Sequence, residues 1–472
     1  MTAGTQETQA ALPRHRLPAG ILRGLARGAG GVAAVTRLVV AQHSKNVLAI
    51  RWLAELAEDV GHPQAALTRA ALDALARLEG RAPEAVHRTL RDPMIGAWAM
   101  RTALRLHRAP SLTSQPGHLA SVAVSAAARA GVPLSITLPG PVPGQHAVDL
   151  PTLGRAHLPP PRSGEHLSAI QARVEPGGRV ELAYGAALLS LPTGLASDTP
   201  GWTTLPRFET ASAGLAMRVR FDGTALAWPD DDRAETDPPS RADLLRLDAA
   251  DRATLHRWHQ RLAGGWDLLV RQHRRVAAET AAAITVIAPL RPPASGQSSG
   301  TFRGAFGCFA LSLPPDDVTA AVTLAHEIQH AKLAALMDLV PLVRPGEARL
   351  FYAPWRDDPR PVTGLLHGLY AHLGVAGFWR RHLRAERPGQ GRALAEVEYL
   401  RWRDACRQVA GVLRREPALT PTGEWIVAQL ADVLGIWCRQ DVVSDQARRA
   451  AAEIATRHRL RWTEQYGEGP SR

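Results

Sequence analysis

The sequence predicts an α+β protein that is predominantly helical, with helical N-terminal and C-terminal regions around a short sheet. Apolar residues recur at intervals of three and four from residue 17 to about residue 108 and again beyond residue 240, which is typical of amphipathic helices. Between these regions proline and glycine become frequent. Short runs such as the alternating residues 217–221 indicate half-buried strands there.

The composition is that of a globular protein, with 45% hydrophobic and 21% charged residues. No stretch reaches the roughly 18 apolar residues that a membrane span needs, and residues 1–13 lack the pattern of a secretory signal, so we expect a cytoplasmic protein. The net charge is +12, but the arginines are scattered among acidic residues, and we expect no nucleic-acid partner. The three cysteines fit no disulfide or zinc spacing, and we expect them to be buried thiols.

Four regions are predicted: a helical region at 1–109, a β-containing region at 110–239, a catalytic region at 240–380 and a helical region at 381–472. In the first region, Asp92 and Pro93 are a plausible N-cap and first residue of a helix. In the second, strands are expected at 134–138, 179–184 and 217–221. An acidic run at 230–232 and two prolines at 238–239 close that region as a loop.

In the catalytic region the sequence predicts helices that alternate with strands. A long helical stretch at 244–283 precedes a buried strand at 284–288, which Pro289 is expected to end. A Gly/Ser loop at 296–300 and a second strand at 307–313 follow. The next helix begins after the N-cap Asp316 and ends before Pro341.

This last helix contains the motif His326-Glu327-Ile328-Gln329-His330. Two histidines four residues apart project from one helical face, so both imidazoles can bind one metal ion. In zinc peptidases a glutamate in the place of Glu327 is the general base that activates metal-bound water. The motif therefore predicts a catalytic metal and a zincin-like helix beside the short sheet.

A third ligand is needed, since two histidines hold a catalytic metal poorly. The extended peptidase pattern would place it at residue 336, which is leucine. The next candidates are His367 and His372 on a second apolar helix, about 140° apart around it, so we do not expect both to face the metal. We favour His367, then His372, with the distant Glu396 or Glu398 as further alternatives.

The connection between the two helices, residues 352–361, is rich in arginine, proline and aromatic residues. Arg356 or Arg360 beside a metal is suited to gripping a carboxylate with two parallel hydrogen bonds. We assign Tyr352 and Trp355 as candidate substrate-binding residues. A rigid connector with surface ion pairs is the alternative. Peptidase helices of this type usually have an apolar residue where this chain has Lys332, which disfavours peptidase chemistry.

The chain resembles the HExxH-type peptide β-hydroxylases, iron- and 2-oxoglutarate-dependent enzymes of actinobacterial ribosomal-peptide pathways, some fused to radical-SAM maturases. The resemblance covers most of the chain and is sharpest at residues 300–380. It implies Fe(II) held by His326, His330 and His367, with the far carboxylate of 2-oxoglutarate on Arg360 or Arg356. It also implies that a ferryl intermediate hydroxylates a side-chain β-carbon of a precursor peptide. Histidine ligation with open positions suits non-haem iron, although the usual triad includes a carboxylate. The matching stretches are 92–98, 150–156, 304–314, 324–333, 353–361 and 364–379.

Three functions therefore compete. The leading hypothesis is the Fe(II)/2-oxoglutarate-dependent peptide β-hydroxylase, which needs molecular oxygen and a ribosomally made precursor peptide, with a co-encoded radical-SAM maturase as a further candidate partner. The second is a zinc-dependent metallopeptidase that uses Glu327 as its general base. The third is a non-catalytic module that binds a leader peptide.

Overall fold

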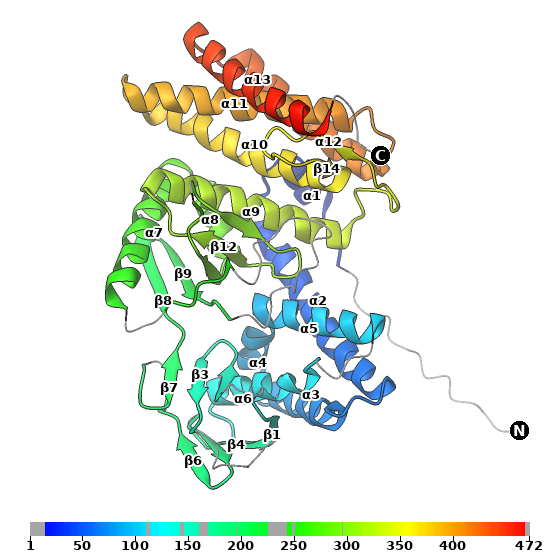
Figure 1. Cartoon of the computed structure of the whole chain (residues 1–472), viewed down its shortest axis with the longest axis vertical. Helices are drawn as coiled ribbons and strands as arrows, with labels where there is room; N and C mark the ends of the chain where they lie inside the picture. Colours follow the sequence, from blue (N-terminus) through cyan, green and yellow to red (C-terminus); the bar gives the residue numbers. More distant parts are fainter. Residues whose placement is uncertain are drawn as a thin grey trace, which may run out of the picture.

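The described part of the chain consists of helices and four small sheets. The computed structural model describes residues 15–109, 114–141, 146–159, 169–195, 197–224, 243–247, 251–294 and 296–467. The described chain is α+β and mostly helical, with 57% helix and 16% strand, which confirms the predicted class. The elements form three tiers along the long axis (Figure 1). The loop predicted at 230–232 and 238–239 lies outside the described residues.

The lower tier combines the N-terminal helices with two antiparallel sheets. The sheets have the strand orders β1-β4-β5-β6 and β2-β3-β7, and they share one hydrophobic core with the helices above them. The three strands predicted from the sequence are confirmed within a few residues as β1, β5 and, in the middle tier, β9. The elements of this tier are α2 (Gly31–Asp59), α3 (Ala65–Glu79), α4 (Pro83–Leu90), α5 (Pro93–Arg108), α6 (Leu119–Ala130), β1 (Leu134–Pro139), β2 (Ala147–Leu150), β3 (Gly154–His157), β4 (Ala169–Val174), β5 (Val180–Tyr184), β6 (Ala187–Ser190) and β7 (Trp202–Thr204).

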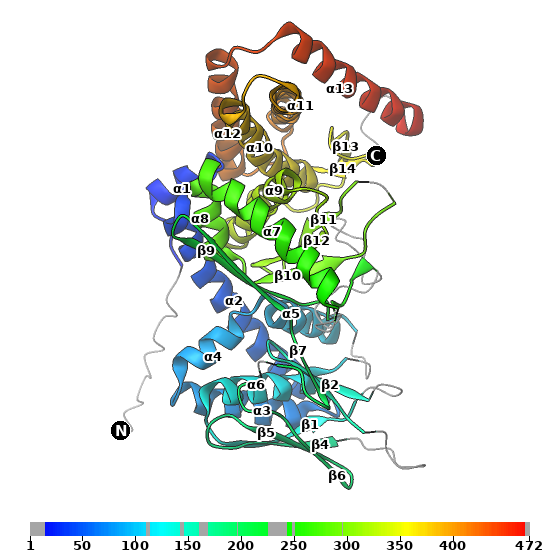
Figure 2. The same ribbon diagram turned by 90° about the vertical axis from the view of Figure 1, so that its left-hand side faces the viewer.

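The middle tier is a five-stranded sheet of order β11-β12-β10-β9-β8, flanked by α7, α8 and α9. Strand β10 runs parallel to β9 and β12, whereas β11 is an antiparallel edge strand on β12 (Figure 2). Every residue of β10 and β12 is buried, as expected for central strands. The bounds are β8 (Arg207–Ser212), β9 (Leu215–Phe221), α7 (Arg252–Gln272), α8 (Arg274–Ala283), β10 (Val286–Leu290), β11 (Ser299–Thr301), β12 (Cys308–Ser312) and α9 (Asp317–Leu339).

The helical stretch predicted at 244–283 is wrong as a single element. Residues 244–247 are not helical, and α7 and α8 are separated at His273, whose φ of −131° and ψ of 40° leave the helical region. The His273 ring stacks on Phe378 of another helix, with centroids 4.3 Å apart and planes inclined by 12°. This tertiary contact accompanies a break that helical periodicity does not reveal.

Two further expectations around the sheet are wrong. Strand β10 continues through Pro289 instead of ending there. Its pairing with β9 covers only Val286 and Ile287, so no hydrogen bond to β9 is lost where proline lacks an N–H. The predicted Gly/Ser loop contains β11, because Ser299 to Thr301 pair in register with β12. Both differences arise from strand pairing, which a single segment does not encode.

Helix α9 begins as predicted, at the N-cap Asp316. The Asp316 carboxylate accepts hydrogen bonds from the backbone N–H and the hydroxyl of Thr319, at 2.7 and 2.9 Å. We expect Asp316→Ala to lower the free energy of unfolding by about 1 kcal/mol, because a free N–H at the start of the helix loses its partner. Urea denaturation measures this. Asp316→Ser keeps an N-cap acceptor and should lie close to the wild type, and equal losses in both variants would contradict the capping role.

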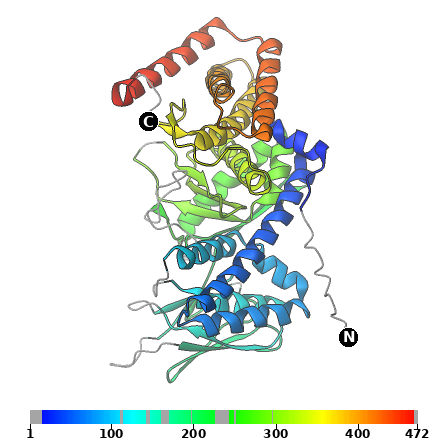
Figure 3. The same ribbon diagram turned by 90° about the vertical axis from the view of Figure 1, so that its right-hand side faces the viewer.

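The upper tier is a group of long helices, and α13 lies across its top (Figure 3). The short α1 packs against this group, and α2 extends from it down into the lower tier. The predicted boundary at residue 380 falls inside α10. The bounds are α1 (Ala19–Ala26), β13 (Leu350–Phe351), β14 (Arg360–Pro361), α10 (Val362–Ala385), α11 (Gln390–Leu413), α12 (Pro421–Gln440) and α13 (Asp445–Tyr466).

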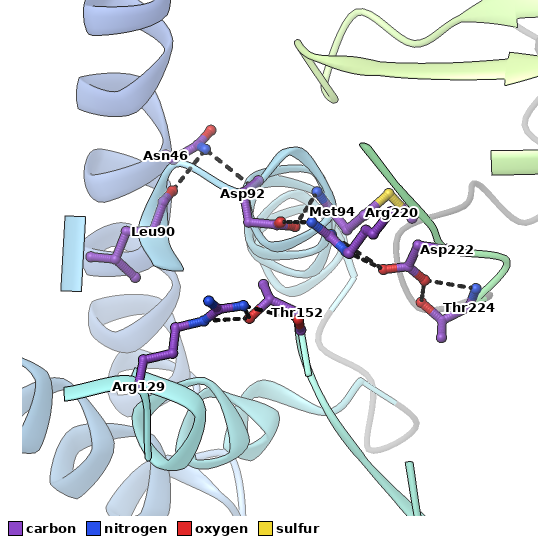
Figure 4. Close-up of polar contacts among 9 residues, drawn as sticks. All are labelled: Asn46, Leu90, Asp92, Met94, Arg129, Thr152, Arg220, Asp222 and Thr224. Carbon is purple, nitrogen blue, oxygen red and sulfur yellow. Dashed lines mark hydrogen bonds and ion pairs between the residues drawn. The ribbon is translucent and has the colours of Figure 1, made fainter. Parts of the chain in front are cut away.

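A buried ionic network joins the lower and middle tiers (Figure 4). Arg220 of β9 pairs with Asp92, at 2.5 Å, and with Asp222, at 3.3 Å. Asp92 also accepts a hydrogen bond from the backbone N–H of Met94, so the predicted N-cap of α5 is confirmed. Burial by itself would lower the pKa of Arg220, but the two carboxylates outweigh it and raise that pKa. The side chain is therefore cationic and locks α5 to the sheet.

Cys308 and Cys406 are buried free thiols, as predicted, whereas Cys438 is half-buried. Within the described ranges, no single helix combines the length and the apolar character needed to cross a membrane. The bent pair α1 and α2 passes that test by length and composition only.

Candidate metal centre

Four histidines line one cavity of about 300 Å³ between α9 and α10. His326 and His330 come from α9, and His367 and His372 come from α10. Strand β11 and the segment before α10 complete the wall. The other lining residues are Ser299, Gly300, Thr301, Arg303, Glu327, Ala334, Trp355, Arg356, Arg360, Thr363, Gly364 and Gly368.

The two motif histidines face each other closely. Their Nε2 atoms are 3.0 Å apart, and the rings are inclined by 79° with centroids 4.6 Å apart. Burial lowers the pKa of His326 to about 4, and burial with the neighbouring His326 lowers that of His330 to about 3. Both imidazoles are therefore neutral at pH 7, the form in which histidine binds metals.

His372 approaches His326, with centroids 4.8 Å apart and planes inclined by 72°. Its Nδ1 lies 2.9 Å from the carbonyl oxygen of Gly368 and must carry the proton to donate this bond, so its Nε2 keeps a lone pair. Trp355 stacks on the ring at 4.5 Å. Burial and the nearby His326 hold the pKa of His372 well below its usual value. The ring is thus oriented and neutral.

His367 lies instead near His330, with nearly parallel rings whose centroids are 5.9 Å apart. Burial lowers the pKa of His367 to about 4. The five-residue spacing led us to expect that His367 and His372 would not both face a metal. Both line the cavity because each approaches a different member of the α9 pair.

Glu327 is 1% exposed, and strand β11 engages both of its carboxylate oxygens. The Ser299 hydroxyl donates to Oε1 at 2.7 Å, and the Thr301 hydroxyl donates to Oε2 at 2.6 Å. The Gly/Ser composition of their segment predicts a loop, so these two residues are not among the predicted site residues. Their alternation around Gly300 is the signal that would have indicated a strand with both hydroxyls on one face.

Arg356 and Arg360 extend from the segment before α10 to the cavity, as the sequence suggested. Both contact Asp358: the Arg356 Nε lies 3.0 Å from Oδ1, and the Arg360 Nη2 lies 2.9 Å from Oδ2. Trp355 packs so tightly on Gly368 that a Cβ there would lie 2.3 Å from the indole. This glycine therefore permits the aromatic wall of the cavity.

Other candidates lie elsewhere. The Tyr352 hydroxyl lies 2.8 Å from Nδ1 of His458 on α13, and its ring packs on Trp462. Glu396 accepts hydrogen bonds from the backbone N–H and the hydroxyl of Ser444, at 2.7 and 2.9 Å. Glu398 accepts one from the indole N–H of Trp402, at 2.8 Å. Within the described part of the chain, these three side chains do not line the histidine cavity.

Lys332, two residues after the motif, is fully buried and forms a structural ion pair. Its Nζ lies 2.6 Å from Glu279 of α8 and 3.3 Å from the carbonyl oxygens of Gly28 and Ala29. Glu279 also accepts a hydrogen bond from the backbone N–H of Gly31, at 2.8 Å. The buried ion pair at the α1–α2 corner therefore explains why residue 332 is a lysine, whichever reaction the histidine motif supports.

The motif pair fits a metal ion at two adjacent positions. Nitrogens bound at about 2.1 Å with a right angle between them lie about 3.0 Å apart, which matches the measured separation of the two Nε2 atoms. Among the described residues, no three His, Cys, Asp or Glu side chains are placed closely enough to hold a metal as they stand. A complete centre therefore requires a third donor to move inward.

Comparisons with models of known protein families and with curated proteins find no match for this chain, so its chemistry is inferred from its own residues. Those residues are four histidines, a clamped glutamate and two arginines around one cavity.

Proposed function

We propose that this protein is an Fe(II)- and 2-oxoglutarate-dependent oxygenase that hydroxylates the β-carbon of a residue in a ribosomally made precursor peptide. The supporting observation is a pair of neutral imidazoles, 3.0 Å apart, in a cavity that also carries two arginines. Ferrous iron with 2-oxoglutarate and oxygen supplies the oxidising power to convert a C–H bond to C–OH, with succinate and carbon dioxide as co-products.

His326 and His330 would hold two adjacent positions on the iron. His372 is the better third donor than His367, because its ring centroid lies 4.8 Å from that of His326 and its free nitrogen is Nε2. His367 is nearly parallel to His330 at a greater separation. A three-histidine set differs from the usual triad with one carboxylate, and it leaves open positions for substrates.

The arginines give the cavity a carboxylate-binding end. Arg360, with a side chain 13% exposed, is better desolvated than Arg356 at 39% and is our choice for the far carboxylate of 2-oxoglutarate. A guanidinium can grip a carboxylate through two parallel hydrogen bonds, and Asp358 orients both arginines before the ligand arrives. Trp355 forms the apolar wall beside this end.

Glu327 would be a positioning residue. Both of its oxygens already accept hydrogen bonds from hydroxyls, so accepting a proton from water would cost one of those bonds. Its role in the oxygenase is to fix the motif helix against β11. This arrangement of α9 beside an antiparallel edge strand is the basis for inferring a zincin-like catalytic half.

We expect His372→Ala to reduce iron binding more than His367→Ala. The reason is that loss of a third ligand weakens the site, by more than the 10- to 100-fold typical of residues that only support ligands. Competitive iron titration of both purified variants measures the difference. A larger loss in His367→Ala would instead assign His367 as the third ligand.

The proposed function is tested by incubating the purified protein with Fe(II), 2-oxoglutarate, oxygen and the precursor peptide encoded next to its gene. We expect the peptide to gain the mass of one oxygen atom, with one succinate formed per hydroxylation. Arg360→Gln should raise the KM for 2-oxoglutarate while the protein still binds iron. Absence of both succinate and a mass gain in the iron-loaded wild type would reject the oxygenase.

The zinc metallopeptidase is the second candidate, because Glu327 lines the same cavity as the two motif histidines. A peptidase would retain one equivalent of zinc after purification and cleave peptides, and Glu327→Gln would abolish cleavage without releasing the metal. If the protein is an oxygenase, we expect instead that Glu327→Gln binds iron more weakly and forms more succinate per hydroxylated peptide than the wild type. The cytoplasmic location and the radical-SAM maturase partner stay predictions.

A further inference from the structure

A second cavity, of about 120 Å³, lies where α1, α8, α9, α10 and α12 meet, and it shares no lining residue with the histidine cavity. Five arginines from three helical segments surround it, together with His273 and Gln329. The complete lining is Arg27, Gly28, His273, Arg275, Val276, Gln329, Leu373, Gly374, Gly377, Phe378, Arg380, Arg381, Arg384 and Trp437.

The positive charge of this arginine pocket is only partly balanced. Arg380 and Arg384 share one carboxylate, that of Asp441, at 2.5 and 2.8 Å. Arg275 lies 3.9 Å from Glu279, which already pairs with the buried Lys332. Arg27 and Arg381 have no carboxylate partner in the described part of the chain. The pocket therefore has an excess of cations that a bound anion would offset.

Two lining residues, His273 and Gln329, each carry a buried polar atom without a hydrogen-bond partner among the described residues. His273 is 2% exposed, its ring is fixed by stacking on Phe378, and its Nε2 has no hydrogen bond. Gln329 is 4% exposed: its amide nitrogen donates to the carbonyl oxygen of Gly28 at 3.0 Å, and its Oε1 has no donor. Buried polar atoms are rarely left unsatisfied. Both atoms have almost no accessible surface, so they do not face the open space of the pocket, and the arginines alone indicate an anionic ligand.

We propose that the arginine pocket binds a phosphate-type dianion, either inorganic phosphate or the phosphate of a monoester. Near neutral pH such a group carries negatively charged oxygens for several guanidinium groups. A planar carboxylate offers only two oxygens, whereas arginines reach this pocket from α1, α8 and α10. A phosphate group fits the volume, and the remainder of an ester would extend toward solvent.

Inorganic phosphate titrated into the full-length protein by calorimetry, at low ionic strength in a chloride buffer, tests the site. We expect saturable binding with one site, weakened at least about tenfold in Arg381→Gln and in Arg275→Gln because each removes a charge-assisted contact. The matched control is Arg77→Gln, an exposed arginine on α3, which should bind as the wild type does. Both arginines are exposed, so neither substitution should disturb folding. A loss seen in both variants therefore does not depend on the folding of one of them.

Phosphoserine and glycerol phosphate distinguish a monoester from the inorganic ion: tighter binding of either assigns the site to an ester, and weaker binding of both assigns it to phosphate. His326→Ala should leave phosphate binding unchanged, so failure of the proposed oxygenase does not affect this test. No saturable binding of phosphate at millimolar concentration, or equal affinity in wild type, Arg381→Gln and Arg275→Gln, would reject the proposal.

Discussion

Replacement of His326 by alanine is expected to remove the bound metal and with it all turnover. The Nε2 of His326 lies 3.0 Å from that of His330, and the ring of His372 is inclined to it at 4.8 Å, so His326 is the member shared by both pairs. Its loss leaves no adjacent pair of nitrogens. We expect the metal content to fall from about one equivalent to near zero and the rate of succinate formation to fall by at least about 100-fold.

Elemental analysis and succinate release measure these two effects on the same preparation. The control is His256→Ala, an exposed histidine on α7, which should keep the metal and the activity of the wild type. A His326→Ala variant that retained one equivalent of metal would show that the ion binds elsewhere. Retained metal would also remove the basis for the proposed function, because the motif pair is what supports it.

Replacement of Lys332 by methionine is expected to lower the free energy of unfolding by about 3–5 kcal/mol. The substitution leaves Glu279, 1% exposed, with a buried charge and no cation closer than Arg275 at 3.9 Å. Removing one partner of a buried ion pair is costly for this reason. Burial lowers the pKa of Lys332 while Glu279 raises it, and burial is the larger effect. The midpoint of urea denaturation, followed by circular dichroism, measures the loss.

The double variant Lys332→Met with Glu279→Leu is the control that separates charge from packing. With both charges removed and the volume kept, most of the stability should return. The residual deficit should be about 1 kcal/mol, because the backbone N–H of Gly31 loses its acceptor. Equal losses in the single and double variants would mean that shape at this corner, not the unpaired carboxylate, determines stability.

The local features of the motif helix were predictable from the sequence. Asp316 and Asp92 cap their helices as expected, since capping depends on a side chain and a backbone N–H two or three residues away. The pairing of His326 and His330 follows from the helical repeat in the same way. These are short-range relations, and the order of residues is enough to establish them.

The partners of the motif were not predictable in this way. Ser299 and Thr301 reach Glu327 only because β11 pairs with β12, and their alternation around Gly300 does not specify which strand they pair with. Tyr352 lies in the same segment as Arg356 but packs on α13, because its hydroxyl bonds to His458. Neither placement is encoded within one segment.

The helical character, the capped motif helix and the i, i+4 histidine pair therefore follow from the order of residues, because each depends on residues within a turn or two of one another. The approach of His372 to His326, the hydrogen bonds from β11 to Glu327 and the burial of Lys332 beside Glu279 depend on the three-dimensional packing. Those contacts join helices and strands that are far apart along the chain. Their geometry is set by the packing of whole elements, which no local pattern specifies.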